Sequence, residues 1–178
     1  MLLTKEQLST IAPTLKEPKL SVYTKAINDT LECYDIKTPS QIAMFVAQIM
    51  HESGACIYTE ELASGKAYEG RKDLGNTQAG DGVRFKGRGL IQITGRANYT
   101  KLSEAFGIDF VKNPELLESP EWAAKSAGWF WSSRRLNDHA VTNSEAAFLI
   151  VTKRINGGTN GLDDRKKYWT RAKKVLGL

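Results

Sequence analysis

Two glutamates, Glu52 and Glu61, lie close together in this chain in settings that could support chemistry. Glu52 ends an apolar helical run, in the segment His51-Glu52-Ser53-Gly54, and Glu61 follows in the segment Glu61-Leu62-Ala63-Ser64-Gly65. Two carboxyl groups on either side of a sugar linkage are what glycoside hydrolysis requires, because one donates a proton and the other handles the attacking group. The pair therefore suggests the hypothesis that the protein is an enzyme that acts on a glycan.

Other carboxylates compete with Glu61 for the second role. Glu60 is its neighbour, and in an extended chain the two side chains would face opposite sides. Glu69 is a further candidate, although the nearby Arg71 offers a plain ion pair. Periodicity cannot choose among them, and each could equally be an ordinary surface glutamate.

The segment from Gly87 to Thr94 supplies polar groups that could serve a sugar site. Alternation predicts a short extended piece with Gln92 and Thr94 on one face. The Gln92 amide can bind sugar hydroxyl or acetamido groups, and Thr94 can hold a water molecule. A buried strand with a polar outer face is the plainer interpretation. Phosphate binding is a weak third one, because the fingerprint around the two glycines is incomplete.

One predicted helix must position Glu52. Thr38 can cap it, Pro39 suits its first position, and Gln41 completes a capping box. An apolar stripe follows, and at about 100° per residue Glu52 returns to nearly the same face as Phe45. A glutamate there is costly to keep ionised. Either a buried partner compensates this cost, or the cost favours the protonated form that a general acid needs.

The rest of the chain is predicted to be mainly helical, with one long irregular stretch from Ala55 to Phe85 that forms a small hairpin or an ordered loop. Periodicity and capping signals predict helices from Thr4 to about Ile11, Pro18–Cys33, Arg96–Phe106, Glu121–Ser132 and Ser144–Ile155, and a basic helix after the turn 156–161. We expect Thr142 and Glu145 to form the capping box of the helix at 144–155.

Length and composition predict a single domain over residues 1–178, acting as a monomer. The net charge of +5 suits an anionic partner such as a wall polymer or membrane surface. Much of it lies in the C-terminal stretch that begins at Arg165-Lys166-Lys167 and has an apolar side. A solvated helix face is the favoured explanation of that stretch, and no nucleic-acid motif accompanies it.

The two cysteines, the apolar runs and the first residues show no signal of a disulfide framework, a membrane span or a secretory leader. Cys33 and Cys56 are too few for a disulfide framework and are expected to be thiols, and no metal or cofactor site is predicted. No apolar run is long enough to cross a bilayer, and the first residues lack the pattern of a secretory signal.

Four separated segments together resemble glycoside hydrolase family 19, and within it the small phage and prophage endolysins rather than plant chitinases. They are His51-Glu52-Ser53-Gly54, the block Gly87–Thr94 with the trailing Asn98-Tyr99, Ile155-Asn156-Gly157-Gly158, and Asp164-Arg165. Glu61 falls where the endolysin branch places its second carboxylate. The interval between the two glutamates is shorter than in plant chitinases, and the disulfides of plant members are absent.

The resemblance implies a mainly α, two-lobed, lysozyme-like fold with a substrate cleft between the lobes, and roles for particular residues. It makes Glu52 the general acid and Glu61 the base, with Thr94 helping to hold the hydrolytic water. The implied substrate contacts are Gln92, Asn98, Tyr99, Asn156 and Arg165. We further expect Arg165 to balance the local negative charge, which helps keep Glu61 ionised.

The implied activity is inverting hydrolysis of β-1,4 bonds between the amino sugars of peptidoglycan, by an endolysin that lyses bacterial walls. Accumulation in the host cytoplasm until release to the wall is the matching localisation. Chitinase activity, a lytic transglycosylase reaction and a non-catalytic wall-binding module are the alternatives. The basic C-terminal stretch could in addition contact an anionic outer-membrane or wall surface.

Overall fold

A computed structural model describes residues 2–178; Met1, the first residue of the segment without a secretory signal pattern, lies outside them. The described residues contain eight α-helices and four short 3-10 helices. The α-helices are α1 Lys5–Ile11, α2 Lys19–Cys33, α3 Pro39–Glu52, α4 Asp81–Arg84, α5 Arg96–Phe106, α6 Pro120–Ser133, α7 Glu145–Asn156 and α8 Leu162–Leu176. The 3-10 helices are η1 Lys66–Tyr68, η2 Lys72–Leu74, η3 Pro114–Glu118 and η4 Leu136–Asp138. The prediction of a mainly α fold is confirmed.

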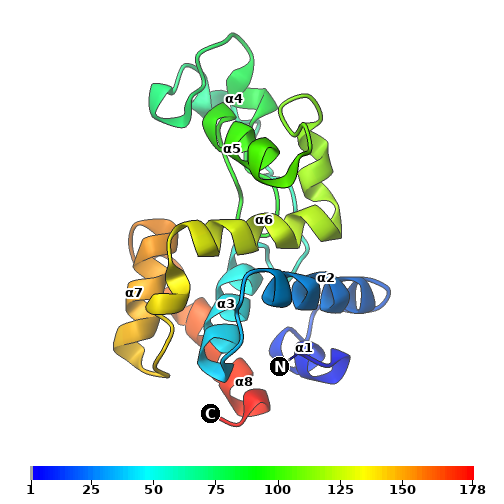
Figure 1. The fold of residues 1–178 in the computed structure, drawn as a ribbon, viewed down its shortest axis with the longest axis vertical. Coiled ribbons are helices and arrows are strands. Elements are labelled where there is room, and N and C mark those ends of the chain that lie inside the picture. The colour runs from blue at the N-terminus through cyan, green and yellow to red at the C-terminus, as the bar shows by residue number, and fades with distance from the viewer. Residues whose placement is uncertain (1) are drawn as a thin grey trace.

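The helices form two lobes joined by α6 (Figure 1). The larger lobe holds α1, α2, α3, α7 and α8 together with both ends of the described chain, and the smaller lobe holds α4 and α5. Every residue of α3 from Ile42 to Met50 is buried, because α8, α7 and other parts of the larger lobe surround it. The helix that ends in Glu52 is therefore the centre of the larger lobe.

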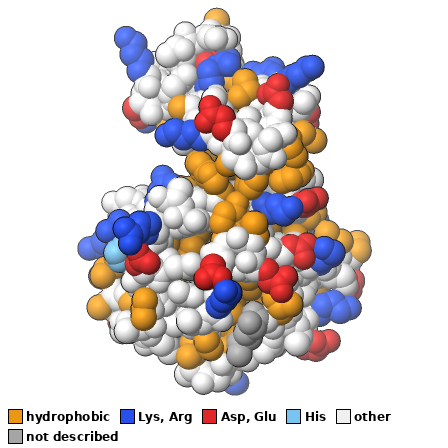
Figure 2. Space-filling view, viewed as in Figure 1, with side chains coloured by type: hydrophobic (Ala, Val, Ile, Leu, Met, Phe, Trp, Pro, Cys, Tyr) orange, Lys and Arg blue, Asp and Glu red, His pale blue; other side chains and the backbone are white. Residues whose placement is uncertain are grey.

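The molecule is narrow between the lobes, and hydrophobic side chains gather at this waist (Figure 2). The end of α3 that carries Glu52 points toward the waist, and the chain then crosses into the smaller lobe (Figure 1). This is the two-lobed arrangement that the resemblance implies. That residues 1–178 form one domain, without a separate wall-binding domain, stays a prediction. Over residues 2–178, none of the helices is long and apolar enough to traverse a bilayer.

Local capping chemistry sets the start of α3 as predicted. The Thr38 hydroxyl accepts a hydrogen bond from the Gln41 N–H, and the Gln41 side chain accepts one from the Thr38 N–H. The prediction for α7 was wrong. Its N-cap is Ser144, whose hydroxyl accepts a hydrogen bond from the Ala147 N–H, while Thr142 lies two residues earlier and its hydroxyl contacts the Ser144 hydroxyl.

The irregular stretch from Ala55 to Phe85 is an ordered loop that contains η1, η2 and α4. The segment from Gly87 to Thr94 is not the extended piece that alternation predicts. Arg88 and Ile93 exchange two backbone hydrogen bonds around a tight turn, in which Gln92 has a φ of 55°. Ile91 and Ile93 are nevertheless buried while Gln92 and Thr94 remain partly exposed, so the expected sidedness holds through a turn.

Candidate active site

Glu52 at the end of α3 is held by an arginine from the other end of the chain. The Arg165 guanidinium, on the first turn of α8, donates from Nη2 to Glu52 Oε1 at 2.5 Å. Arg165 is 2% exposed and the Glu52 side chain 20% exposed, so the carboxylate still reaches solvent. Of the two explanations for a glutamate on an apolar face, the structure shows the first, a buried partner of opposite charge.

Arg165 balances negative charge at the site through its ion pair with Glu52, and the expected help to Glu61 stays a prediction. Its other groups bind neutral acceptors, the Asn160 carbonyl from Nε at 3.2 Å and the Gln48 Oε1 from Nη1 at 2.6 Å. These two neutral acceptors hold the guanidinium in place while it pairs with Glu52. With 2% of its surface exposed, Arg165 has little left with which to touch a substrate.

Glu61 lies in the segment that enters the smaller lobe, and neutral donors hold its carboxylate. The Tyr68 hydroxyl donates to Oε1 at 2.9 Å, and the Gly87 N–H donates to Oε2 at 3.1 Å. A Cβ added at Gly87 would lie 2.7 Å from Gln92 Oε1 and 3.3 Å from Glu61 Oε2, so only glycine allows both side chains to approach this backbone. Gln92 and Glu61 are therefore neighbours.

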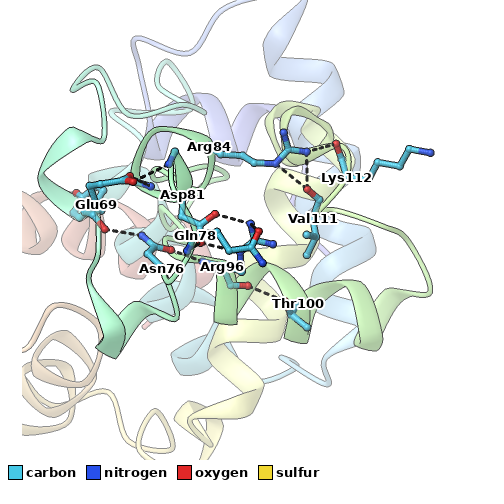
Figure 3. Close-up of polar contacts among 12 residues, drawn as sticks. Glu69, Asn76, Gln78, Asp81, Arg84, Arg96, Thr100, Val111 and Lys112 are labelled. Atoms are coloured by element: carbon cyan, nitrogen blue, oxygen red, sulfur yellow. Dashed lines mark hydrogen bonds and ion pairs between the residues drawn. The ribbon is translucent and has the colours of Figure 1, made fainter.

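The two rival carboxylates have structural partners instead. Glu60 Oε1 makes ion pairs with Lys86 and Arg88, each at 3.0 Å. Glu69 accepts the N–H groups of Gly80 and Gly82, at 2.7 and 2.8 Å, and so fixes the chain at the start of α4 (Figure 3). Glu60 is thus paired with two cations, and both Glu69 oxygens bind backbone N–H groups beside α4, which leaves Glu61, the neighbour of Gln92, as the second carboxylate.

A polar network in the smaller lobe supports the residue that holds Glu61 (Figure 3). The fully buried Asn76 donates to the Tyr68 carbonyl at 2.9 Å and accepts the Arg96 N–H at 2.8 Å. The Arg96 side chain in turn pairs with the buried Asp81 at 2.5 Å, and this contact lowers the pKa of Asp81. The backbone of Tyr68 is thus tied to the N-terminus of α5.

A hollow of about 690 Å³ lies beside this network, and neither Glu52 nor Glu61 lines it. Arg84 donates to the carbonyls of Val111 and Lys112 across it, and Arg96 is engaged by Asp81 and Gln78 (Figure 3). The polar groups that line this hollow are therefore largely hydrogen-bonded to one another. The two carboxylates therefore indicate the candidate active site better than this hollow does.

Three further predicted residues form a short chain of contacts beside Glu61. The Thr94 hydroxyl donates to the Gln92 carbonyl at 2.9 Å, and the Asn98 amide donates to the Thr94 carbonyl at 2.8 Å. All three side chains are partly exposed. The structure thus places Gln92, which neighbours Glu61 across Gly87, together with Thr94 and Asn98.

Two predicted contacts lie elsewhere. Tyr99 is completely buried, and its hydroxyl donates to the Lys86 carbonyl at 2.8 Å, so it forms the support of the site rather than its surface. Asn156 ends α7 and donates to the Asn160 carbonyl at 2.9 Å, the same oxygen that accepts from Arg165. Asn156 is therefore on the Glu52 side of the site, because Asn156 and Arg165 donate to the same Asn160 carbonyl.

Sequence reasoning missed Tyr68, Asn76 and Gln48 as supporting residues. The signal for Gln48 was present, because it is the one polar residue that interrupts the apolar run from Ile42 to Met50. Tyr68 and Asn76 carried no comparable signal, since both lie in the irregular stretch where periodicity fails.

Comparison with known proteins identifies the family. Residues 35–146 match the family model described as Chitinase class I. A glycosyl hydrolase family 19 domain-containing protein of Haemophilus influenzae is 32% identical over 176 residues, covering 82% of this chain and 84% of that protein. The chain belongs to glycoside hydrolase family 19. The resemblance to the family is confirmed, and this family 19 chain is a glycoside hydrolase.

Other family 19 proteins share parts of the chain or its fold. An Arabidopsis thaliana endochitinase is 34% identical over 145 residues, which cover 78% of this chain but only 48% of the plant protein. The structure of chitinase C from Streptomyces griseus superposes with a TM-score of 0.76 at 25% identity, over 98% of this chain and 76% of that one. A bacterial family 19 chitinase matches in fold with a TM-score of 0.78 at 21% identity, covering all of this chain and 96% of the other.

Proposed function

We propose that this family 19 hydrolase cuts β-1,4 bonds between amino sugars of peptidoglycan by an inverting mechanism, as an endolysin does. The observation that carries the proposal is the difference between the two carboxylates. Glu52 belongs to the larger lobe and is backed by a buried cation, while Glu61 lies where the chain enters the smaller lobe and is held by neutral donors. Two carboxyl groups in unlike settings can take the roles of acid and base.

In the proposed mechanism Glu52 protonates the leaving oxygen as the glycosidic bond breaks. Arg165 binds Oε1, and within residues 2–178 no hydrogen bond engages Oε2, so Oε2 is the oxygen that carries the proton. Once the proton has left, the Arg165 cation stabilises the carboxylate that remains. The pairing therefore assists the step in which negative charge develops on Glu52.

Glu61 is proposed to act as the base on a water molecule positioned by Thr94. The donors Tyr68 and Gly87 keep the Glu61 carboxylate oriented. Gln92 and Asn98 lie beside Glu61 and are proposed to bind the sugar. Inversion requires the two carboxyl groups to lie about 6.5–9.5 Å apart, so that water fits between carboxylate and sugar.

Two features support peptidoglycan as the substrate. The stem peptides of peptidoglycan carry carboxylates, which suit a protein of net charge +5, whereas chitin is uncharged. The short interval between Glu52 and Glu61 also departs from plant chitinases. Chitin hydrolysis is the second candidate, favoured by the names of the Arabidopsis and Streptomyces relatives.

The basic face of α8 is a proposed contact for an anionic wall or outer-membrane surface. Its apolar side is buried against the larger lobe through Trp169, Ala172 and Leu176. The exposed residues Lys167 and Lys174 therefore offer charge alone, and such a contact would weaken as salt concentration rises.

Digestion of purified sacculi, with mass spectrometry of the released muropeptides, tests the proposed function. Reducing ends support hydrolysis, and their sugar identifies the bond that is cut, whereas 1,6-anhydro ends would indicate a lytic transglycosylase. Binding to sacculi without release of fragments would indicate a wall-binding module. Cleavage of N-acetylglucosamine oligomers alone would favour a chitinase, and an α-anomeric product from the β-linked substrate indicates inversion.

Variants of the two glutamates test their roles. Glu52→Gln and Glu61→Gln should each abolish cleavage while leaving the fold intact, although Glu52→Gln should also lower the unfolding temperature because it leaves the buried Arg165 guanidinium without its charged partner. Glu60→Gln reports on the rival base, and Glu104→Gln, an exposed glutamate on α5, is the matched control. Full activity of Glu52→Gln would refute its role as the acid.

A further inference from the structure

Gln48 is a completely buried polar side chain inside the apolar stripe of α3. Burying an amide is unfavourable unless its donors and acceptor find partners. Here Nε2 donates to the Thr152 hydroxyl at 2.8 Å, and Oε1 accepts from Arg165 Nη1 at 2.6 Å. Three helices, α3, α7 and α8, therefore meet at this one amide.

The chemistry of the partners fixes which way the Gln48 amide faces. A guanidinium has donors only, so the amide oxygen must face Arg165 and the amide nitrogen must face Thr152. Thr152 is itself completely buried on α7, where its hydroxyl oxygen is the acceptor for Gln48. Gln48 lies four residues before Glu52, so the two side chains share one face of α3 and can grip one guanidinium.

The neutrality of Gln48 matters as much as its position. The Arg165 guanidinium donates to three acceptors, the Asn160 carbonyl, the Gln48 amide and the Glu52 carboxylate, and only the last is charged. The nearby Asp164 carboxylate contacts the His51 ring, with 2.8 Å between Oδ2 and Nδ1, and not the Arg165 guanidinium. The cation is therefore shared with no second carboxylate among these contacts.

We propose that Gln48, oriented by Thr152, is a positioning residue that fixes the Arg165 guanidinium and reserves its charge for Glu52. The inference rests on the proposed role of Glu52 as the acid. It assigns to a neutral amide, one turn before Glu52, control over how the Arg165 charge is presented to the Glu52 carboxylate.

Gln48→Glu tests the charge part of this inference, because it changes the amide to a carboxyl group of nearly the same shape. Two carboxyl groups on one guanidinium share a proton to higher pH than one alone. The alkaline limb of the pH–rate profile should therefore move upward by about one pH unit. Gln41→Glu, the same change at the other end of α3, should leave the profile where it is.

Gln48→Leu and Thr152→Val test the positioning part. Loss of the fixed guanidinium should lower kcat about 10–100-fold for Gln48→Leu and about tenfold for Thr152→Val, with little change in KM. Thr30→Val removes another completely buried hydroxyl, far along the chain on α2, and should leave kcat unchanged. Soluble glycan strands released from sacculi are the substrate, and circular dichroism verifies folding.

The outcomes separate this inference from the proposed function. A superimposable pH profile for Gln48→Glu, together with full kcat for Thr152→Val, would show that Gln48 is a core residue only. If Gln48→Leu does not fold, the two near-isosteric variants still decide. Should Glu52→Gln retain activity, the acid assignment itself fails, whatever the Gln48 variants do.

Discussion

Removal of the Tyr68 hydroxyl is the sharpest test of how Glu61 is held. The hydroxyl donates to Glu61 Oε1 at 2.9 Å, and burial together with Glu61 raises the pKa of Tyr68, so the phenol keeps its proton. Hydrogen bonds to a charged group contribute about 1.5–3 kcal/mol. Because the contact is only partly buried, we take about 1.4 kcal/mol, which corresponds to one pH unit or a factor of ten.

Tyr68→Phe should therefore shift the acid limb of the pH–rate profile upward by about one pH unit, since the ionised form of Glu61 loses a donor. The plateau rate should fall about tenfold, because the carboxylate is less well oriented. Reducing-end release from soluble glycan strands across pH gives both quantities. Tyr58→Phe, an exposed tyrosine of the same loop, is the matched control. An unchanged acid limb with a full plateau rate would refute the assigned role of Tyr68.

Three further predictions concern stability. Asp81→Asn should destabilise the protein by about 3 kcal/mol at pH 7 in denaturant unfolding, because it leaves a guanidinium without its buried partner. The arginine contact depresses the pKa of Asp81, so its stabilisation is present above about pH 4 and is lost as pH falls; the two proteins should converge in acid. Ser144→Ala should cost about 1 kcal/mol and Thr142→Ala less than about 0.5 kcal/mol, and the reverse order would contradict the assigned cap. Gly161→Ala places a Cβ 2.2 Å from the His51 ring at a φ of 69°, so we expect a loss of about 2 kcal/mol in thermal unfolding; an unchanged midpoint would mean that the ring moves freely.

The parts of the fold that depend on neighbouring residues could be predicted from the sequence. The start of α3 follows from Thr38, Pro39 and Gln41, which interact within one turn. The cap of α7 could not be chosen in the same way, because Thr142 and Ser144 both carry hydroxyls near the helix start. Which hydroxyl caps the helix depends on where the first turn closes, and side-chain type does not reveal this.

Contacts between distant residues were the other limit. Alternation indicated the buried and exposed sides of the segment up to Thr94, but the left-handed conformation of Gln92 has no signal in residue type. Which of the two glutamates pairs with Arg165 could not be predicted for a related reason. The order of motifs along the chain does not tell which carboxylate lies behind α8. Glu61 was separated from Glu60 and Glu69 only by the contacts that engage the other two.

The span of the Glu52–Arg165 contact has a consequence for how the protein acquires its activity. The two residues lie 113 positions apart, whereas Glu61 meets Tyr68 only seven positions away. Contacts across long stretches of chain form slowly, because closing a large loop costs conformational entropy before any contact compensates it. During refolding, the surroundings of Glu61 should therefore be complete while α8 is still undocked. The recovery of catalytic activity would then report when α8 docks, because this docking depends on contacts between residues far apart in the chain.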